Sequence, residues 1–211
     1  MRAIAKGPEP ASLAEHRAVP GADFDGYRDK ETLRGCLVRE QRGLCCYCLS
    51  RIHTDRDAMK IEHWHSRGQY PMEQLNYTNL LAACKGNEGK PRRDQHCDTH
   101  KGDRELSRNP ANPLHRIEES LRFRGDGHLF SDDPAFEADL NEVLNLNQPF
   151  LVNNRKAVLD AFLQSLPSYG LLRHATLNRW LLEWNGESSP GELRPFCQVV
   201  VYWIRKRMAR Q

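Results

Sequence analysis

The segment KIEHWHS, residues 60–66, sets one acidic residue beside two histidines. Glu62 directly precedes His63, and His65 follows two positions later. A neutral histidine can take a proton from water, and a carboxylate can hold a hard divalent cation. Metal-assisted hydrolysis of a phosphodiester bond needs a deprotonated water and a cation beside the leaving oxygen, and these two groups could supply both. Alone, the motif fits equally well a surface acid beside a hydrogen-bonded histidine, so its meaning depends on the residues around it.

Four of the seven cysteines bracket this segment with metal-ligand spacing: Cys45, Cys48, Cys84 and Cys97. The first two form a C-x-x-C turn, and the other two flank a polar stretch. A structural zinc ion takes four tetrahedral ligands and favours thiolates. An odd number of cysteines argues against a disulfide framework. We therefore predict a four-cysteine zinc site, called here the zinc knuckle, that joins the cysteine turn to a helix beginning at residue 97.

Three other interpretations of the cysteines stay open. All four could be small buried thiols, and His53 or His96 could replace one of them as a ligand. Cys46 is spare, and Cys36 and Cys197 are expected in the hydrophobic core.

The elements that would position these residues are indicated by apolar spacing. Leu33, Cys36 and Leu37 lie at helical spacing within residues 29–42, and Gly43 suits a helix end. The segments MKIEHW (59–64) and LLAAC (80–84) are typical of strands separated by a polar loop. The segment CDTHKGDRELSR could open a helix. The Gly125-Asp126-Gly127 turn predicts a hairpin within residues 120–130.

The remaining chain predicts an α+β protein that is mainly helical. Residues 1–27 are expected to be an extended lead-in. Helices are expected near 134–144, 150–166, 171–185 and 190–208. Their apolar stripes should be core: Val158, Leu159, Phe162, Leu163, Leu177, Trp180, Leu181 and Trp184. Three regions follow: an N-terminal extended segment and helix (1–42), a central core with the zinc knuckle (43–108), and a hairpin and helical C-terminal region (109–211).

Charge and hydropathy restrict the partners. The formal net charge is +3, but residues 85–108 hold seven Lys/Arg against five Asp/Glu, and WIRKRMARQ has four basic residues and no acid. Basic patches attract phosphate backbones, although basic residues also suit a helix end. No apolar run approaches the roughly 20 residues of a membrane span, and the N-terminus lacks the apolar core of a secretion signal. We expect a cytoplasmic protein without a membrane partner.

The order of these motifs resembles the HNH nuclease family: CCYC (45–48), IEH (61–63), NLLAAC (79–84) and CDTHKGD (97–103). The resemblance implies a ββα-metal motif backed by the four-cysteine zinc knuckle. It implies His63 as general base, Glu62 and Asp98 as ligands of a catalytic Mg²⁺ or Mn²⁺, and Asn79 as the residue that orients the base. The family more often has Asp or His at position 62, and His or Asn at position 98. His100 is the alternative second ligand.

Four more residues are candidate nucleic-acid contacts. The resemblance gives Lys101 a phosphate contact. His65 shares strand parity with His63 and could face the same cleft. Arg92 and Arg93, in the long segment between Cys84 and Cys97, could grip a backbone or belong to a solvent loop.

A closer resemblance covers most of the chain. The segments IAKGPEPASL, REQRGLCCYC, HCDTHKGD and LNLNQPFLVNNRKAVLD are similar to the HNH endonucleases of retron and Septu-type anti-phage systems, the PtuB-like nucleases. This resemblance implies an effector nuclease that works with a co-encoded ABC-type ATPase (PtuA-like) and, in some systems, a retron reverse transcriptase with its msDNA. DNA is the expected substrate. The alternatives are an RNA-cleaving nuclease with the same site, for example on tRNA, and a non-catalytic zinc-dependent nucleic-acid-binding subunit.

Overall fold

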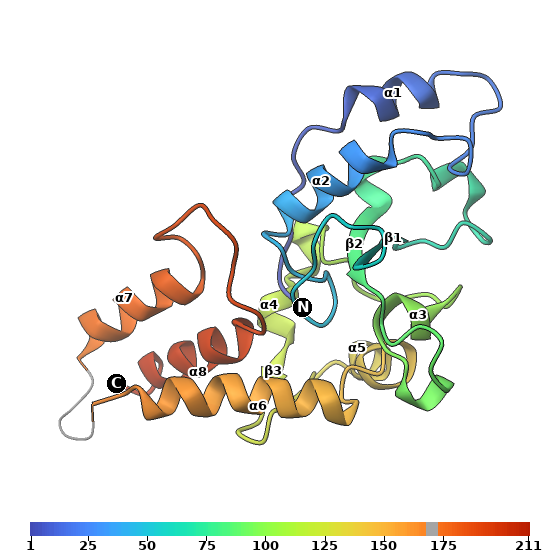
Figure 1. Cartoon of the computed structure of the whole chain (residues 1–211). Coiled ribbons are helices and arrows are strands. Elements are labelled where there is room, and N and C mark those ends of the chain that lie inside the picture. Colours follow the sequence, from blue (N-terminus) through green and yellow to red (C-terminus); the bar gives the residue numbers. More distant parts are fainter. Residues whose placement is uncertain (168–172) are drawn as a thin grey trace.

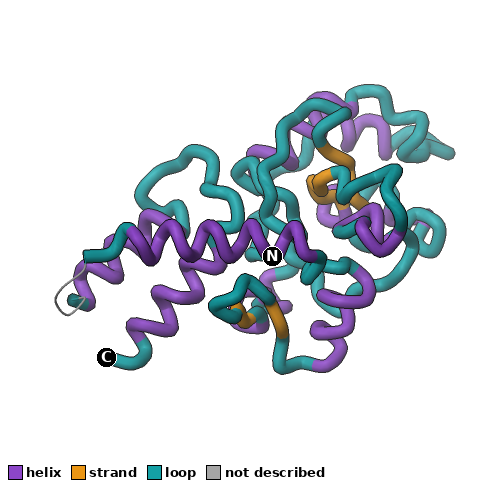
Figure 2. The backbone as a smooth tube through the Cα atoms, turned by 60° about the horizontal axis from the view of Figure 1, so that its bottom comes forward, coloured by secondary structure: helices purple, strands orange, loops and turns teal. Residues whose placement is uncertain are grey.

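The computed structural model describes residues 1–167 and 173–211, which form an α+β fold with more helix than strand (Figures 1 and 2). The helices are α1 (Ala11–Arg17), α2 (Lys30–Glu40), α3 (Cys97–Lys101), α4 (Ile117–Ser120), α5 (Pro134–Ala138), α6 (Pro149–Gln164), α7 (His174–Trp184) and α8 (Gln198–Met208). The strands are β1 (Met59–His63), β2 (Leu80–Cys84), β3 (Arg122–Phe123) and β4 (Leu129–Phe130). The predicted fold class is confirmed at this level.

The β1–β2 hairpin is the centre of the first half of the chain. The two strands are antiparallel, with Met59 opposite Cys84 at one end and His63 opposite Leu80 at the other. Every residue of β2 is buried. The free side of β2 is closed by Gln41, whose side-chain amide accepts from Ala82 N at 2.7 Å and donates to Ala82 O at 2.7 Å. A side chain thus satisfies backbone groups that a third strand would otherwise bond.

The second half is a helical layer in which α6, α7 and α8 lie together (Figure 1). Helix α6 begins with Pro149, which suits the first helical position, and Gln148 caps it. Phe162 of α6 meets the rings of Trp180, Trp184 and Trp203 edge to face, with centroids 5.5–5.8 Å apart. Among the described residues, no helix has the length and apolar character needed to cross a bilayer.

Most predicted elements are present, with the expected strands, hairpin and helices near their predicted places. One buried cluster includes residues from all three predicted regions, so their division stays a prediction.

Three details were wrong. Residues 1–27 are not all extended, because α1 forms after Pro10 and buries Leu13. The last helix begins only at Gln198, since Gly191 and Pro195 lie in the preceding loop. The helix predicted near 134–144 is present, and its second half, Asp139–Val143, is a π-helix. Leu163 is 36% exposed and lies outside the core. Positions 171–172 of the third predicted helix lie outside the described residues.

Candidate metal centre and active site

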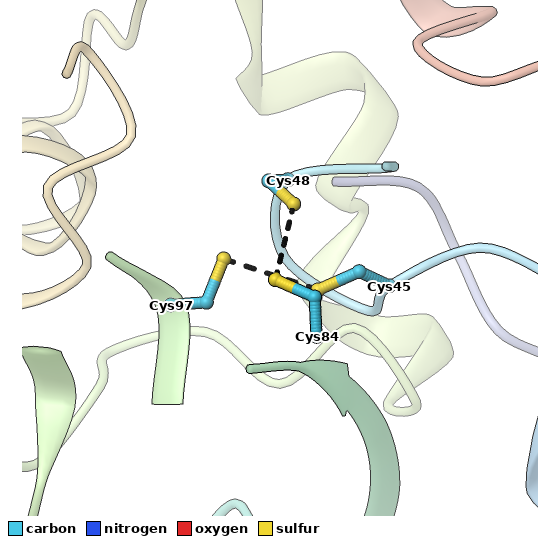
Figure 3. A group of neighbouring side chains, drawn as sticks. All are labelled: Cys45, Cys48, Cys84 and Cys97. Atoms are coloured by element: carbon cyan, nitrogen blue, oxygen red, sulfur yellow. Dashed lines mark hydrogen bonds between the residues drawn. The ribbon is translucent and has the colours of Figure 1, made fainter. Parts of the chain in front are cut away.

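The four predicted cysteines converge on one point (Figure 3). Cys45 and Cys48 come from the turn before β1, Cys84 ends β2, and Cys97 begins α3. Their sulfur atoms all lie within 4.8 Å of one another, with Cys45–Cys97 at 3.9 Å and Cys48–Cys84 at 3.7 Å. A tetrahedron with Zn–S bonds of about 2.3 Å has edges of about 3.8 Å, which these two pairs match, so the cluster could hold a metal ion such as zinc.

The cluster is formed by local turn geometry and closed to solvent. Cys45 N donates to Ser50 O at 2.9 Å, and Leu44 pairs with Arg51, which folds the C-x-x-C turn back on itself. The four cysteines are at most 9% exposed. Burial raises the pKa of the Cys97 thiol, because a buried thiolate loses its hydration. A bound dication reverses that preference, and the donor set therefore suits a structural metal such as zinc.

Two basic side chains lie beside the cluster. His96 Nδ1 lies 3.2 Å from Cys97 Sγ. Arg155 of α6 is 2% exposed, and its Nη1 has no hydrogen-bond partner among the described residues. Burial lowers the pKa of Arg155 to about 10, and the nearby Cys48 and Cys97 oppose that lowering. If the cysteines are deprotonated, the cluster is negatively charged. Arg155, from the C-terminal half, places a positive charge beside it.

The other cysteines and the two alternative ligands are accounted for. His53 is exposed and outside the cluster, and His96 contacts sulfur without replacing a cysteine. Cys46 and Cys197 are buried as core residues, whereas Cys36 is only half-buried.

A second group of side chains gathers at the opposite end of the hairpin. An open pocket of about 570 Å³ is lined by Glu62 and His63 from β1 and by Asp98 and Lys101 from α3. The Glu62 carboxylate is 3% exposed and lies 2.9 Å from Lys101 Nζ. Burial and the neighbouring Asp98 carboxyl group raise the pKa of Glu62 well above its usual value. Two carboxyl groups held together in this way favour a cation between them.

His63 is held in the form of a base. Its Nε2 lies 3.0 Å from Gln74 O, and because a carbonyl can only accept, Nε2 carries the proton. In the neutral ring Nδ1 is therefore left unprotonated. Burial lowers the pKa of His63 to about 4, and the positive charges of Arg67 and Lys101 act in the same direction. The ring packs edge to face on Phe24, with centroids 4.5 Å apart.

Asn79 fixes the loop that orients this histidine. Its side-chain oxygen accepts from His65 N at 2.7 Å, and its amide donates to His65 O at 3.0 Å and to Glu73 O at 3.3 Å. Glu73 directly precedes Gln74, whose carbonyl holds the His63 ring. The arrangement fits the predicted role of Asn79, which is to orient His63. Asn79 would do so indirectly, by hydrogen bonds to the backbone of the loop that carries Gln74.

His65 and His100 do not reach the pocket. β1 ends at His63, so strand parity does not continue to His65, which instead contacts Glu73 at 2.7 Å and stacks on Tyr70. The expectation that His65 faces the His63 cleft is wrong. His100 lies two residues after Asp98 on α3, on the other face of the helix, and its Nδ1 lies 2.9 Å from Val143 O. The structure brings Asp98, rather than His100, to Glu62.

The basic residues that were predicted to contact nucleic acid lie in different surroundings. The Lys101 side chain is 1% exposed, and its ammonium also donates to His63 O at 3.0 Å, so it belongs to the pocket wall. Arg92 and Arg93 are exposed on the segment between Cys84 and Cys97, outside the pocket lining.

Sequence reasoning missed two residues of this site. Tyr47, inside the C-x-x-C turn, donates from Oη to Glu62 Oε1 at 2.7 Å. A buried tyrosine usually needs a hydrogen-bond partner, which was the available signal. Arg67 lines the pocket mouth and pairs with Asp25 at 2.6 Å. The loop that brings it there is not predictable from residue spacing.

Fold and site define an α+β protein with a tetracysteine cluster suited to a metal ion and a neighbouring acid–histidine pocket. No family model matches the chain. Over 61 residues the chain is 31% identical to the Septu protein PtuB of Bacillus thuringiensis. The match covers 29% of this chain and 24% of that protein, so the chain spans about a quarter of the relative's length. This similarity supports a Septu-like relation.

Proposed function

We propose that this protein is a metal-dependent HNH endonuclease that cleaves phosphodiester bonds, with DNA as the first substrate to test. One observation carries the proposal: the unprotonated Nδ1 of His63 belongs to a ring that lines the same open pocket as the paired carboxyl groups of Glu62 and Asp98. A binding site needs no buried, neutral histidine beside two acids. Metal-assisted hydrolysis uses a general base and a bound cation, which the histidine and the two carboxyl groups could supply.

In the proposed mechanism, His63 Nδ1 takes a proton from the attacking water while Nε2–H stays bonded to Gln74 O. Glu62 and Asp98 would hold Mg²⁺ or Mn²⁺, an arrangement that suits a hard cation bound through two carboxylates and substrate phosphate. When bound, the cation supplies stabilisation of the leaving oxygen. Asn79 keeps the Gln74 loop in place, so His63 is aligned before substrate arrives.

The positive side chains of the pocket support an anionic substrate. Lys101 neutralises part of the Glu62 charge, and Arg67 lines the mouth beside Gly68 and Asp103. Arg67 is exposed and its partner Asp25 is on the surface, so it can exchange that partner for a phosphate. We assign the phosphate contact to Arg67 together with Lys101, which extends the role predicted for Lys101.

The biological setting in the proposal is anti-phage defence. It follows from the similarity to the Septu protein PtuB together with the motifs of the chain. The protein would be the nuclease subunit beside a co-encoded ABC-type ATPase (PtuA-like). A retron reverse transcriptase with its msDNA stays a prediction of the resemblance alone.

The test is cleavage by wild type and His63→Ala, alone and with the co-encoded ATPase. Plasmid DNA and total RNA are incubated with Mg²⁺ or Mn²⁺. Loss of a general base should lower the rate about 10²–10⁴-fold. His53→Ala, an exposed histidine outside both sites, is the matched control and should retain full activity.

Each result decides between candidates. Cleavage of RNA alone, abolished by His63→Ala, would identify the RNA-cleaving alternative with the same site. Equal cleavage by wild type and His63→Ala would refute the base assignment. Nucleic-acid binding without cleavage under any condition would support the non-catalytic zinc-dependent binding subunit.

A further inference from the structure

A separate hollow lies in the C-terminal half, between α6, α8 and the β3–β4 hairpin. Its volume is about 220 Å³. Three aromatic residues line it: Phe123 of β3, and Tyr202 and Trp203 of α8. Leu159 and Val199 add buried apolar surface. We call it the aromatic pocket. None of the residues that line it also lines the Glu62–His63 pocket.

The aromatic walls are fixed by packing. The rings of Phe123 and Tyr202 lie 5.6 Å apart between centroids. The ring of Phe162 packs edge to face against Trp203, with centroids 5.5 Å apart. Phe123 is 7% exposed, whereas Tyr202 and Trp203 are partly exposed. These rings can therefore contact a ligand without rearrangement of the core.

The rim of the aromatic pocket is basic. Arg124 of the hairpin and Lys206, Arg207 and Arg210 at the end of α8 line it, and no acidic residue does so among the described residues. Arg205, on the same turn of α8, is outside the lining and pairs with Glu118 at 3.0 Å. Basic residues suit the C-terminal end of a helix, but that preference does not explain an aromatic hollow beneath them.

Size and chemistry restrict the occupant. Typical small-molecule sites measure about 300–1,000 Å³, so a pocket of about 220 Å³ suits one ring system rather than a whole cofactor. Aromatic walls under a positive rim match a planar ring attached to phosphates. Proteins hold single strands in this way, by stacking bases on aromatic side chains along a basic path. In a duplex the bases are already stacked and paired.

We propose that the aromatic pocket binds one nucleotide of a single-stranded nucleic acid, with the base against Tyr202 and Trp203 and the flanking phosphates on Lys206 and Arg207. The identification of this strand as substrate rests on the proposed nuclease function. Binding itself does not, because the aromatic pocket shares no residue with the Glu62–His63 pocket.

The experiment measures binding separately from cleavage. Zinc-loaded full-length protein carrying His63→Ala is titrated, without added Mg²⁺ or Mn²⁺, into fluorescein-labelled oligothymidylate and an abasic strand of the same length. The base-containing strand should bind about tenfold more tightly, as expected for one stacked base. Tyr202→Leu should remove most of that preference, and circular dichroism and melting check that each variant is folded.

Charge is tested with a matched pair of variants. Lys206→Ala/Arg207→Ala should weaken binding at low salt and lower the slope of log affinity against log salt by about 1.4, or about 0.7 for each lost contact to a single strand. Arg205→Ala, on the same turn but paired with Glu118, should change neither by a comparable amount.

Three outcomes would overturn the proposal. Equal affinity for the base-containing and abasic strands would reduce the site to a general phosphate-attracting surface. An equal effect of Arg205→Ala would show that the aromatic pocket has no special role. Tighter binding of polyglutamate than of oligothymidylate would indicate an acidic protein partner. Preserved binding with no wild-type cleavage would instead refute the nuclease and leave the aromatic pocket intact.

Discussion

The two ends of one hairpin carry two very different groups of side chains. The end where Met59 faces Cys84 holds the cysteine cluster, and the end where His63 faces Leu80 holds the Glu62–His63 pocket. Helix α3 serves both, because Cys97 joins the cluster while Asp98 lines the pocket. One small scaffold therefore fixes both centres, and their chemistry differs because one is closed and the other open.

The closed end supplies a complete ligand set. Four buried sulfur donors would fill all four coordination positions of a tetrahedral metal ion, as in structural zinc sites. The open end supplies two carboxyl groups and a base, so positions around a cation would remain for water and phosphate. The closed end could therefore hold a structural metal ion, whereas a catalytic cation at the open end belongs to the proposed function.

Tyr47 makes a further connection between the two ends. Tyr47 lies between Cys45 and Cys48 in sequence, and its hydroxyl reaches the Glu62 carboxylate. The geometry of the cysteine turn thus affects the orientation of the Glu62 carboxylate in the pocket.

The largest effect is expected at the closed end, from Cys48→Ser. Structural zinc contributes about 10–16 kcal/mol in zinc-finger peptides, which is as much as the whole stability of a typical protein, about 5–15 kcal/mol. The variant should lose zinc and its cooperative melting together, measured by metal analysis and calorimetry. Cys36→Ser, on the half-buried face of α2, is the control and should keep both. Normal zinc content and melting in Cys48→Ser would contradict the zinc knuckle.

At the open end, Asp98→Ala should reduce cleavage far more than His100→Ala. A lost ligand removes several kcal/mol of charge stabilisation, or about 100-fold or more in rate. His100 contacts Val143 O outside the pocket, so its loss should change the rate by less than about fivefold. Cleavage rates measured across a Mn²⁺ titration test this, and both variants should retain zinc. The opposite order would exchange the two roles.

The connection is tested by Tyr47→Phe. Removal of a hydrogen bond to a metal-binding carboxylate typically lowers metal affinity by about 10–100-fold. We expect weaker Mn²⁺ binding by calorimetry with unchanged zinc content. Tyr77→Phe is a matched control, because Tyr77 also donates to a glutamate, Glu40, but away from the pocket. Equal Mn²⁺ affinity in the wild type and Tyr47→Phe would show that the two ends are independent.

The smallest effect is a pH dependence from His63. Its pKa is about 4 in the fold and about 6.5 in the unfolded chain. Between these values only the unfolded chain binds the proton, so stability falls as the pH falls. From pH 7 to about pH 5.5 the loss should be about 1 kcal/mol. His63→Asn should lack this component in denaturant unfolding, with zinc content checked at both pH values; an equal loss in both proteins would argue against a buried neutral His63.

The sequence predicted the elements whose formation depends on residues close together in the chain. The apolar run of β2, the alternation in β1 and the turn glycines of the second hairpin were sufficient for the strands. The C-x-x-C turn with two further cysteines was sufficient for the cluster, because thiolates and a tetrahedral ion leave little choice. Helix α1 was missed because the prolines and glycines around it conceal a short helix that is stabilised by burial of Leu13.

The sequence by itself determined which residue types could do chemistry and that the cysteines would bring Cys97 to the end of β2. Only the tertiary structure decided which neighbours share a site. Whether His65 faces the same side as His63 depends on where β1 ends. The strand ends at His63, and the next backbone N–H but one, that of His65, bonds to the Asn79 side chain instead. Which face of α3 meets Glu62 depends on helix packing, and the hollow under Lys206 exists only where α6, α8 and a distant hairpin meet. Spacing fixes contacts over a few residues, whereas side-chain directions across the fold are fixed by packing.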